Sequence, residues 1–415
     1  MIEKYYSGVI EQIYNRIGKE TRNIVMANYS NDFSIENLEV IRRYQSNEDN
    51  VFFAYSEFSY NTLVGAYEPF LDIICNMHRR FIGGSFDDFQ KECGVYYLHR
   101  QVLNSYYETG ECFREETVLL NEVAYEQRRM TMAIADMLKK LSEVKPLMIV
   151  INRFQMASKS SIETIKYLID NPCANIGIVL GVNAIVKGTD STVEVWDRIV
   201  ESLEDRSAIY YIGSAGPLKN NVKTTNDDEL YITMNFEQSI QEASNIMEFL
   251  DFEQARRGCR IIEHKLKFED AWIDEKSLRR FYMVYARTSV LLGEMSKAIE
   301  LTNEYKALIP ENDSEHYLSL YYFMKGTCYM YQGKLEKAGN SAKSAYDYAV
   351  LAEDDTLIFK AELLSVMIKM SGWYNIFFCV QDIPVSDEII EKLIKHGYRN
   401  HLAHCLLYTS PSPRD

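Results

Sequence analysis

Five short apolar runs, separated by stretches of helical periodicity, constrain the first half of the chain more than any other feature. The run at residues 147–151 (LMIVI) is apolar throughout and follows Pro146, which is typical of a central strand covered on both faces. The five runs lie at residues 23–27, 50–55, 147–151, 175–182 and 208–213. Because strands that alternate with helices form parallel sheets, residues 1–213 are predicted to be an α/β domain.

Apolar residues at helical spacing predict the helices between these runs. The first helix is amphipathic, and Pro69 falls in the first turn of the third, where a missing N–H costs little. The predicted helices cover residues 2–17, 34–44, 66–81, 114–142, 160–170 and 193–203, the fourth with room for one break.

The pattern changes after residue 213. Residues 214–234 are polar and contain Gly, Pro and Asn-Asp, so they are predicted to be a linker. From residue 235 to residue 404 the periodicity is helical almost without interruption, which predicts an all-α domain.

Two segments of this helical domain are similar to each other at a spacing of 40 residues. Gly293 aligns with Gly333, and Ala298 aligns with Ala338. A glycine ends the turn between two antiparallel helices, and a small residue five positions later lets the second helix approach its neighbour closely. The spacing therefore predicts stacked helical hairpins.

These hairpins resemble tetratricopeptide repeats. The first repeat departs from that family, because Ala286 and Tyr305 stand where the family usually has Gly and Ala. The spacing also exceeds the usual ~34 residues, so longer variants of the repeat and an unrelated helical bundle both stay open. The residues expected to pack the repeats are Tyr282, Gly293, Ala298, Tyr322, Gly326, Gly333, Ala338 and Ala345, with the two tyrosines filling the groove opposite the glycine turns.

Residues 146–168 resemble a segment of the nucleotide-binding domain in STAND-class, AAA-related ATPases. That family has two acids after an apolar strand, then an apolar residue and Gln-Trp-Ala-Asp. Gln155 and Ala157 match this frame, whereas Asn152 and Arg153 replace the two acids. The resemblance implies a P-loop NTPase-like domain in degenerate form.

The residues that ATP chemistry needs are absent from this frame. Hydrolysis requires a carboxylate to hold the Mg²⁺ shell, and a phosphate loop requires glycines and a lysine after the first strand. Neither Gly nor Lys occupies the required places after residues 23–27. We therefore expect a pseudo-ATPase that holds no cofactor, with vestigial nucleotide-site positions at Asn28, Phe33, Ser34, Ile35, Asn152 and Arg153.

Charge and cysteine usage exclude several other classes. The net charge of −15 disfavours general nucleic-acid binding. No apolar run approaches the ~20 residues of a membrane-spanning helix, and the first residues do not form a signal peptide. The eight cysteines form no CxxC pair, so reduced thiols in a cytoplasmic protein are expected, without a metal site.

The last residues, 405–415 (CLLYTSPSPRD), match the translation of a transposon-based sequencing adapter. We expect them to be read-through of library DNA, with the natural chain cut near His404 and any C-terminal domain removed.

The order of the two domains resembles the first half of large clostridial signalling proteins that carry a GGDEF diguanylate cyclase. The resemblance implies a non-catalytic sensory or scaffolding half, which binds a protein or peptide in the repeat groove and regulates the missing output domain. A helix-turn-helix or another cyclase could replace that output. Two further functions stay open: a nucleotide-binding STAND switch with unorthodox residues, and a free-standing repeat adaptor.

Overall fold

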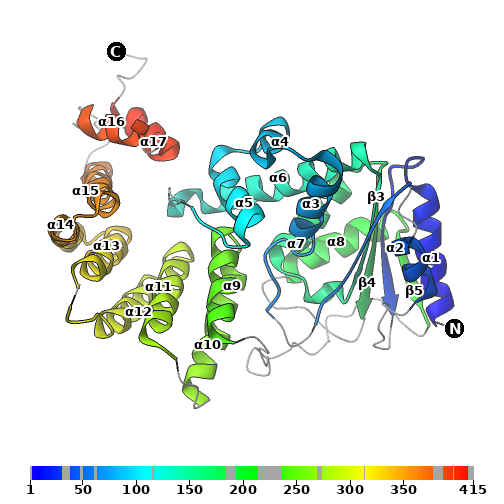
Figure 1. The fold of residues 1–415 in the computed structure, drawn as a ribbon, viewed down its shortest axis with the longest axis horizontal. Helices are drawn as coiled ribbons and strands as arrows, with labels where there is room; N and C mark the ends of the chain where they lie inside the picture. The colour runs from blue at the N-terminus through cyan, green and yellow to red at the C-terminus, as the bar shows by residue number, and fades with distance from the viewer. Residues whose placement is uncertain are drawn as a thin grey trace. The chain divides into compact units, whose positions relative to one another are not determined.

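The fold is seen in a computed structural model, which describes most of the chain (Figure 1). The described residues are 2–29, 38–46, 50–59, 63–114, 116, 118–183, 193–213, 235–268, 273–312, 314–376, 387–395 and 397–409. The chain divides into two compact units, Met1–Ala271 and Trp272–Asp415.

A five-stranded parallel sheet forms the centre of the first unit (Figure 1). Its strands are β1 (Ile24–Tyr29), β2 (Phe52–Glu57), β3 (Leu147–Asn152), β4 (Ile176–Asn183) and β5 (Ile209–Ile212), in the order β2-β3-β4-β1-β5. Every residue of β3 and β4 is buried, as a central strand requires. Each predicted run overlaps one of these strands, so the prediction of a parallel α/β domain is confirmed at this level.

Helices cover both faces of the sheet (Figure 1). On one face, α1 (Ile2–Arg16) and α2 (Glu39–Ser46) pack against alternate residues of the strands. Ile10 and Ile13 of α1 are fully buried there, and each contributes ~1.5–3 kcal/mol by leaving water. The other face carries α3 (Phe70–Met77), α6 (Val123–Val144), α7 (Lys159–Asp170) and α8 (Val193–Glu204).

Three of the predicted helices differ at their ends. The helix expected at 66–81 begins only at Phe70, because Pro69 occupies its N-cap, and it continues as the π-helical turn η1 (His78–Ile82). The stretch 114–142 becomes regular helix only after the 3₁₀ turn η2 (Leu120–Glu122). For the helix expected at 34–44, the structure gives α2 from Glu39, and residues 34–37 lie outside the described part.

Two helices of the first unit, α4 (Phe86–Glu92) and α5 (Tyr97–Thr109), were not predicted from the sequence. Ser85 caps the start of α4, where its side chain accepts a hydrogen bond from the Asp88 amide. Gly110 ends α5 in the left-handed conformation, at φ +75°, where a side chain would be strained.

The helices α9 (Phe236–Glu248) and α10 (Phe252–Phe268) belong to the first unit, although the sequence assigned them to the repeats. The division therefore falls later than the predicted linker at 214–234, which lies outside the described residues. The reason is direct packing on α5 and its following loop. Phe249 lies edge-on to Tyr106 at 5.4 Å, and the Arg114 guanidinium donates to the Glu248 carbonyl at 2.6 Å.

The second unit is helical throughout its described residues. Its helices are α11 (Glu275–Leu291), α12 (Met295–Ala307), α13 (Glu315–Tyr331), α14 (Leu335–Leu351), α15 (Asp355–Ile376), α16 (Asp387–Lys395) and α17 (Arg399–Thr409). The pairs α11–α12 and α13–α14 are hairpins with short turns. Among the described residues of the whole chain, no helix combines the length and the apolar character that crossing a bilayer requires.

The aligned small residues lie at the hairpin turns and between the helices. Gly293 and Gly333 adopt left-handed backbone conformations, at φ +78° and +71°, at equivalent turns. Ala298 and Ala338 are fully buried one turn later. A Cβ at Gly326 would lie 3.0 Å from Leu364 and 3.4 Å from the Ala338 carbonyl oxygen, so α13 and α14 approach closely at this residue.

The other aligned residues differ between the two hairpins. Ala345 is fully buried in the second hairpin, and Tyr305 takes the equivalent buried place in the first. Tyr322 is half-buried and stacks on Tyr348 of its own hairpin, with ring centroids 5.6 Å apart. Tyr282 is also half-buried and its ring lies against Phe281.

The segment assigned to an adapter begins inside a helix. Residues 405–409 continue α17, and Cys405 is buried in a cluster with Leu393 and Tyr398. Residues 410–415 lie outside the described part, and the origin of the segment stays a prediction.

Candidate functional site

The carboxyl ends of the parallel strands meet at one edge of the sheet, where ligands bind in open α/β folds. At this edge β1 ends in Tyr29, β2 in Glu57, β3 in Asn152 and β4 in Asn183. The register places Tyr29 beside Asn183, and Glu57 beside Asn152. Four polar side chains from strands far apart in sequence therefore end at the same edge.

Asn152 is fully buried, and its side-chain oxygen is hydrogen-bonded inside the protein. The Tyr29 hydroxyl donates to Asn152 Oδ1 at 2.5 Å, across the intervening strand β4. The backbone N–H of Arg153 donates to the same oxygen at 3.0 Å. The amide thus holds the end of β3 to β1, a structural role that an uncharged side chain can fulfil in a buried position.

Arg153 brings a positive charge to the end of β3. Its Nη1 lies 3.0 Å from Glu57 Oε1, and the two side chains are only 20% and 16% exposed. The same nitrogen donates to the Phe58 carbonyl at 3.3 Å, and the Tyr55 hydroxyl donates to the other oxygen of Glu57. The Arg153 backbone is left-handed, at φ +54°, which turns the chain sharply after the strand.

Gln155 and Ser158 fix the segment that follows. Gln155 Oε1 accepts a hydrogen bond from the backbone N–H of Asn183 at 3.3 Å. This bond ties the 3₁₀ turn η3 (Phe154–Met156) to β4. Ser158 caps α7, and its hydroxyl lies 3.0 Å from the hydroxyls of both Ser160 and Ser161. The path from β3 into α7 is therefore held by internal hydrogen bonds.

The structure brings together only some of the predicted nucleotide-site positions. Asn152 and Arg153 are adjacent at the edge, and Asn28 is fully buried one residue before the end of β1. The predicted positions Phe33, Ser34 and Ile35 lie outside the described residues.

Sequence reasoning missed Glu57 and Tyr29. Glu57 stands two residues after the second apolar run, and an acid so close to the end of a predicted strand was the available signal.

A second group of buried polar residues joins α7 to the junction of α9 and α10. Asp251 is buried, and its carboxylate accepts a hydrogen bond from the Ser160 amide in the first turn of α7 at 3.0 Å. Burial raises the pKa of this carboxyl group. Gln254 donates to the Val64 carbonyl at 2.9 Å and adds a further link to the loop before α3.

A buried His–Glu pair lies between α5 and α6. His99 Nε2 is 3.1 Å from Glu126 Oε2, and burial lowers the pKa of His99 to about 4. Arg129 also pairs with Glu126, and its guanidinium lies 3.8 Å from the ring centroid of Tyr96. At neutral pH the histidine is uncharged, so the arginine is the cation that balances this carboxylate.

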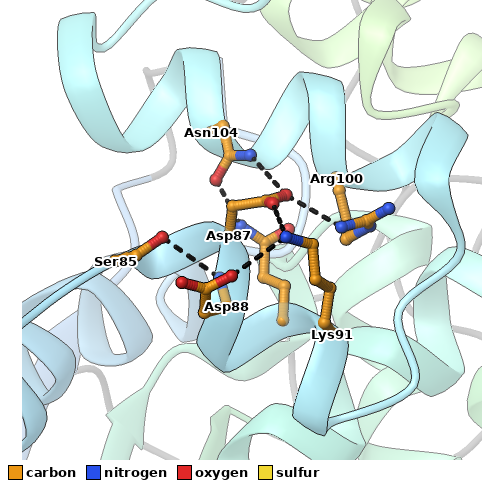
Figure 2. Close-up of polar contacts among 7 residues, drawn as sticks. Ser85, Asp87, Asp88, Lys91, Arg100 and Asn104 are labelled. Carbon is orange, nitrogen blue, oxygen red and sulfur yellow. Dashed lines mark hydrogen bonds and ion pairs between the residues drawn. The ribbon is translucent and has the colours of Figure 1, made fainter.

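Figure 2 shows a third polar cluster, which joins α4 to α5. Arg100 and Asn104, one turn apart on α5, both donate to Asp87 Oδ1 at 3.0 Å. Lys91 bridges Asp87 and Asp88 at 2.7 and 2.9 Å. The hydrogen bond from Lys91 is the main cause that lowers the pKa of Asp87. The paired groups indicate a structural link rather than a ligand site.

None of these clusters has the composition of a metal centre. Within the described ranges, no group of three or more His, Cys, Asp or Glu side chains is arranged to hold a metal ion. No family model matches the chain, and no curated protein is detectably similar to it.

Proposed function

We propose that the first unit is a pseudo-ATPase domain without catalytic activity, and that the chain acts as a sensory or scaffolding protein. The order of the sheet supports this assignment. The strands lie in the order β2-β3-β4-β1-β5, an open parallel α/β sheet of the kind whose carboxyl edge binds ligands, which is compatible with a domain derived from a nucleotide-binding fold. The fold-level likeness alone carries no activity, so the proposal depends on the site.

The observation that carries the proposal is the ion pair between Arg153 and Glu57. A Mg²⁺ ion at the end of β3 would need oxygen ligands there. Instead, a guanidinium lies at this place, and it repels a divalent cation while it occupies the nearby carboxylate. Asn152 Oδ1 is already an acceptor for two hydrogen bonds.

The sequence after β1 supports the same conclusion. Triphosphate binding relies on backbone N–H groups in a glycine-rich turn and on a lysine charge, and neither residue type stands at the required places. Among the residues of this edge that the structure describes, Arg153 is a positive charge that a triphosphate could meet, and it is already paired with Glu57.

The helical hairpins of the second unit are the proposed contact surface for a protein or peptide partner. Stacked hairpins present extended surfaces of this kind in repeat proteins. From the resemblance to clostridial signalling proteins, we further propose that the regulated output domain is a diguanylate cyclase.

Calorimetric titration with ATP, with and without Mg²⁺, tests the proposal. We expect no heat of binding at micromolar ATP in either case. Micromolar binding that depends on Mg²⁺ would refute the pseudo-ATPase and support the nucleotide-switch alternative.

A paired variant shows whether these positions correspond to a metal site at all. Asn152→Asp with Arg153→Asp places two carboxylates beside Glu57, and we expect it to bind Mn²⁺ measurably by water proton relaxation, whereas the wild type does not. The matched control replaces two exposed residues of α6, Ala124→Asp and Arg128→Asp. Equal Mn²⁺ binding by both double variants would remove the assignment of a vestigial metal position.

A further inference from the structure

A cavity of about 190 Å³ lies at the opposite, amino-terminal edge of the sheet. The end of α1, the start of β1, the end of α7 and the turn before β5 form its walls. All of its lining residues are described and belong to the first unit. A space of this size accommodates a ligand somewhat larger than a benzene ring.

The floor of the cavity is held by hydrogen bonds that do not involve a ligand. Asn23 is fully buried, and its side-chain amide donates to the Glu20 carbonyl at 2.5 Å and the Ala174 carbonyl at 3.1 Å. Arg206 Nη1 donates to the Ile169 carbonyl at 2.6 Å. Ser207 next to it is left-handed at φ +51°, which holds the turn in an uncommon conformation. The cavity is therefore built before any ligand enters.

Three guanidinium groups line this cavity against one carboxylate. Arg16 lies 3.6 Å from Glu20, and that pair balances itself. Arg206 donates to a neutral carbonyl, which leaves its charge uncompensated by that contact. Arg22 is exposed and forms no ion pair with any described residue. The lining thus carries an excess of positive charge, although the chain as a whole has a net charge of −15. Anions are therefore expected to be attracted to this cavity.

The remaining walls are largely apolar. The lining includes Leu168, Pro172 and the ring of Tyr210. The Tyr210 hydroxyl donates a hydrogen bond to Gln12 Oε1 at 3.2 Å. A fully hydrated inorganic ion gains little from such walls, whereas an organic group gains by leaving water.

We propose that this cavity binds a small organic oxyanion, in which a carboxylate or phosphate group contacts Arg22 and Arg206 and an apolar body lies against Pro172 and Tyr210. The site is independent of the nucleotide-like edge, so it stands or falls separately from the proposed function. Bidentate geometry makes arginine well suited to both head groups.

The test uses the full chain and three probes of one shape: benzoate, phenyl phosphate and the neutral benzyl alcohol. Saturation-transfer NMR and calorimetry are expected to show binding of at least one of the two anions and none of the alcohol. The anion that binds more tightly identifies the head group. Failure of both anions to bind, or equal binding of benzyl alcohol, would overturn the proposal.

Charge reversal at the rim locates the site. Arg22→Glu is expected to weaken binding of the anion about tenfold or more, and Arg22→Lys to weaken it much less. Arg128→Glu, the same change at an exposed arginine of α6 outside the cavity, is expected to leave the affinity within about twofold. Circular dichroism confirms that each variant is folded, and an unchanged affinity in Arg22→Glu would place binding elsewhere and contradict the proposal.

Discussion

The two units hold their helices together by different means. In the first unit, charged groups such as Arg114, Glu126 and Asp251 are buried between helices and strands. In the described part of the second unit, the buried polar residues are serine and threonine hydroxyls apart from His401, and close helix approach depends on Gly326 and buried alanines. Serine and threonine hydroxyls do not titrate in the usual range, so pH should act mainly on the first unit and steric changes mainly on the second.

The largest expected effect comes from Arg114→Ala. Arg114 is buried, donates to the Glu248 carbonyl at 2.6 Å and lies 3.7 Å from the Glu248 carboxylate, so it fastens α9 to the loop after α5. Breaking a buried pair of this kind costs about 3–5 kcal/mol. Urea unfolding should show the loss, and hydrogen exchange should rise in α9. Arg128→Ala, at an exposed position, serves as the control, and an equal loss there would contradict the role of burial.

A smaller effect, dependent on pH, is expected from Glu242→Gln. A Cβ at Gly65 would lie 3.0 Å from Glu242 Oε1 and 3.3 Å from Glu68 Oε2, so the two carboxylates are close. Burial, followed by the charges of Glu68 and Asp72, raises the pKa of Glu242 to about 7. Protonation therefore favours the folded state.

The sign of this effect follows from the raised pKa. The stabilising contribution of Glu242 is complete below pH 4.5 and is lost as the pH rises through 7. The variant should match the wild type near pH 4.5 and exceed it at pH 8 by up to about 3 kcal/mol. Urea titrations at the two pH values measure the difference. Glu237→Gln, a change at an exposed position of the same helix, should show no such pH-dependent gain in stability. A gain in Glu242→Gln that does not depend on pH would be evidence against the carboxylate pair.

The smallest of the three effects is steric and belongs to the second unit. Gly326→Val would press a side chain against Leu364 and Ser341, at a cost of about 1–3 kcal/mol. A Cβ at Gly339 on α14 would meet no neighbouring atom within 4 Å, so Gly339→Val should be neutral or slightly stabilising. Hydrogen exchange within α13 and α14 distinguishes the two variants. Equal destabilisation by both would mean that the close approach at Gly326 does not carry the packing.

The strands and most helices could be predicted because their signals are local. An apolar run or a helical period is visible within one short window, as it is for β3 and α1. Local signals also exist for α4, where Ser85 is the N-cap and two acids stand in the first turn, although the helix is only seven residues long.

The contacts that define the candidate site are not local. Glu57 and Arg153 are far apart in sequence, and only the parallel pairing of β2 and β3 brings them to one edge. The same holds for Phe249, which assigns α9 and α10 to the first unit through contacts with Tyr67 and Tyr106. A helical period predicts that α9 is a helix and gives no information about its neighbours.

The ion pair at the edge of the sheet also constrains how the sequence can change over time. Replacing Arg153 by an acid would set two negative side chains against each other, and replacing Glu57 by a base would do the same with two positive ones. Single steps at either position are therefore disfavoured, while an exchange of both is tolerated. In an alignment of homologous chains, residues 57 and 153 should therefore covary, with the signs of their charges kept opposite.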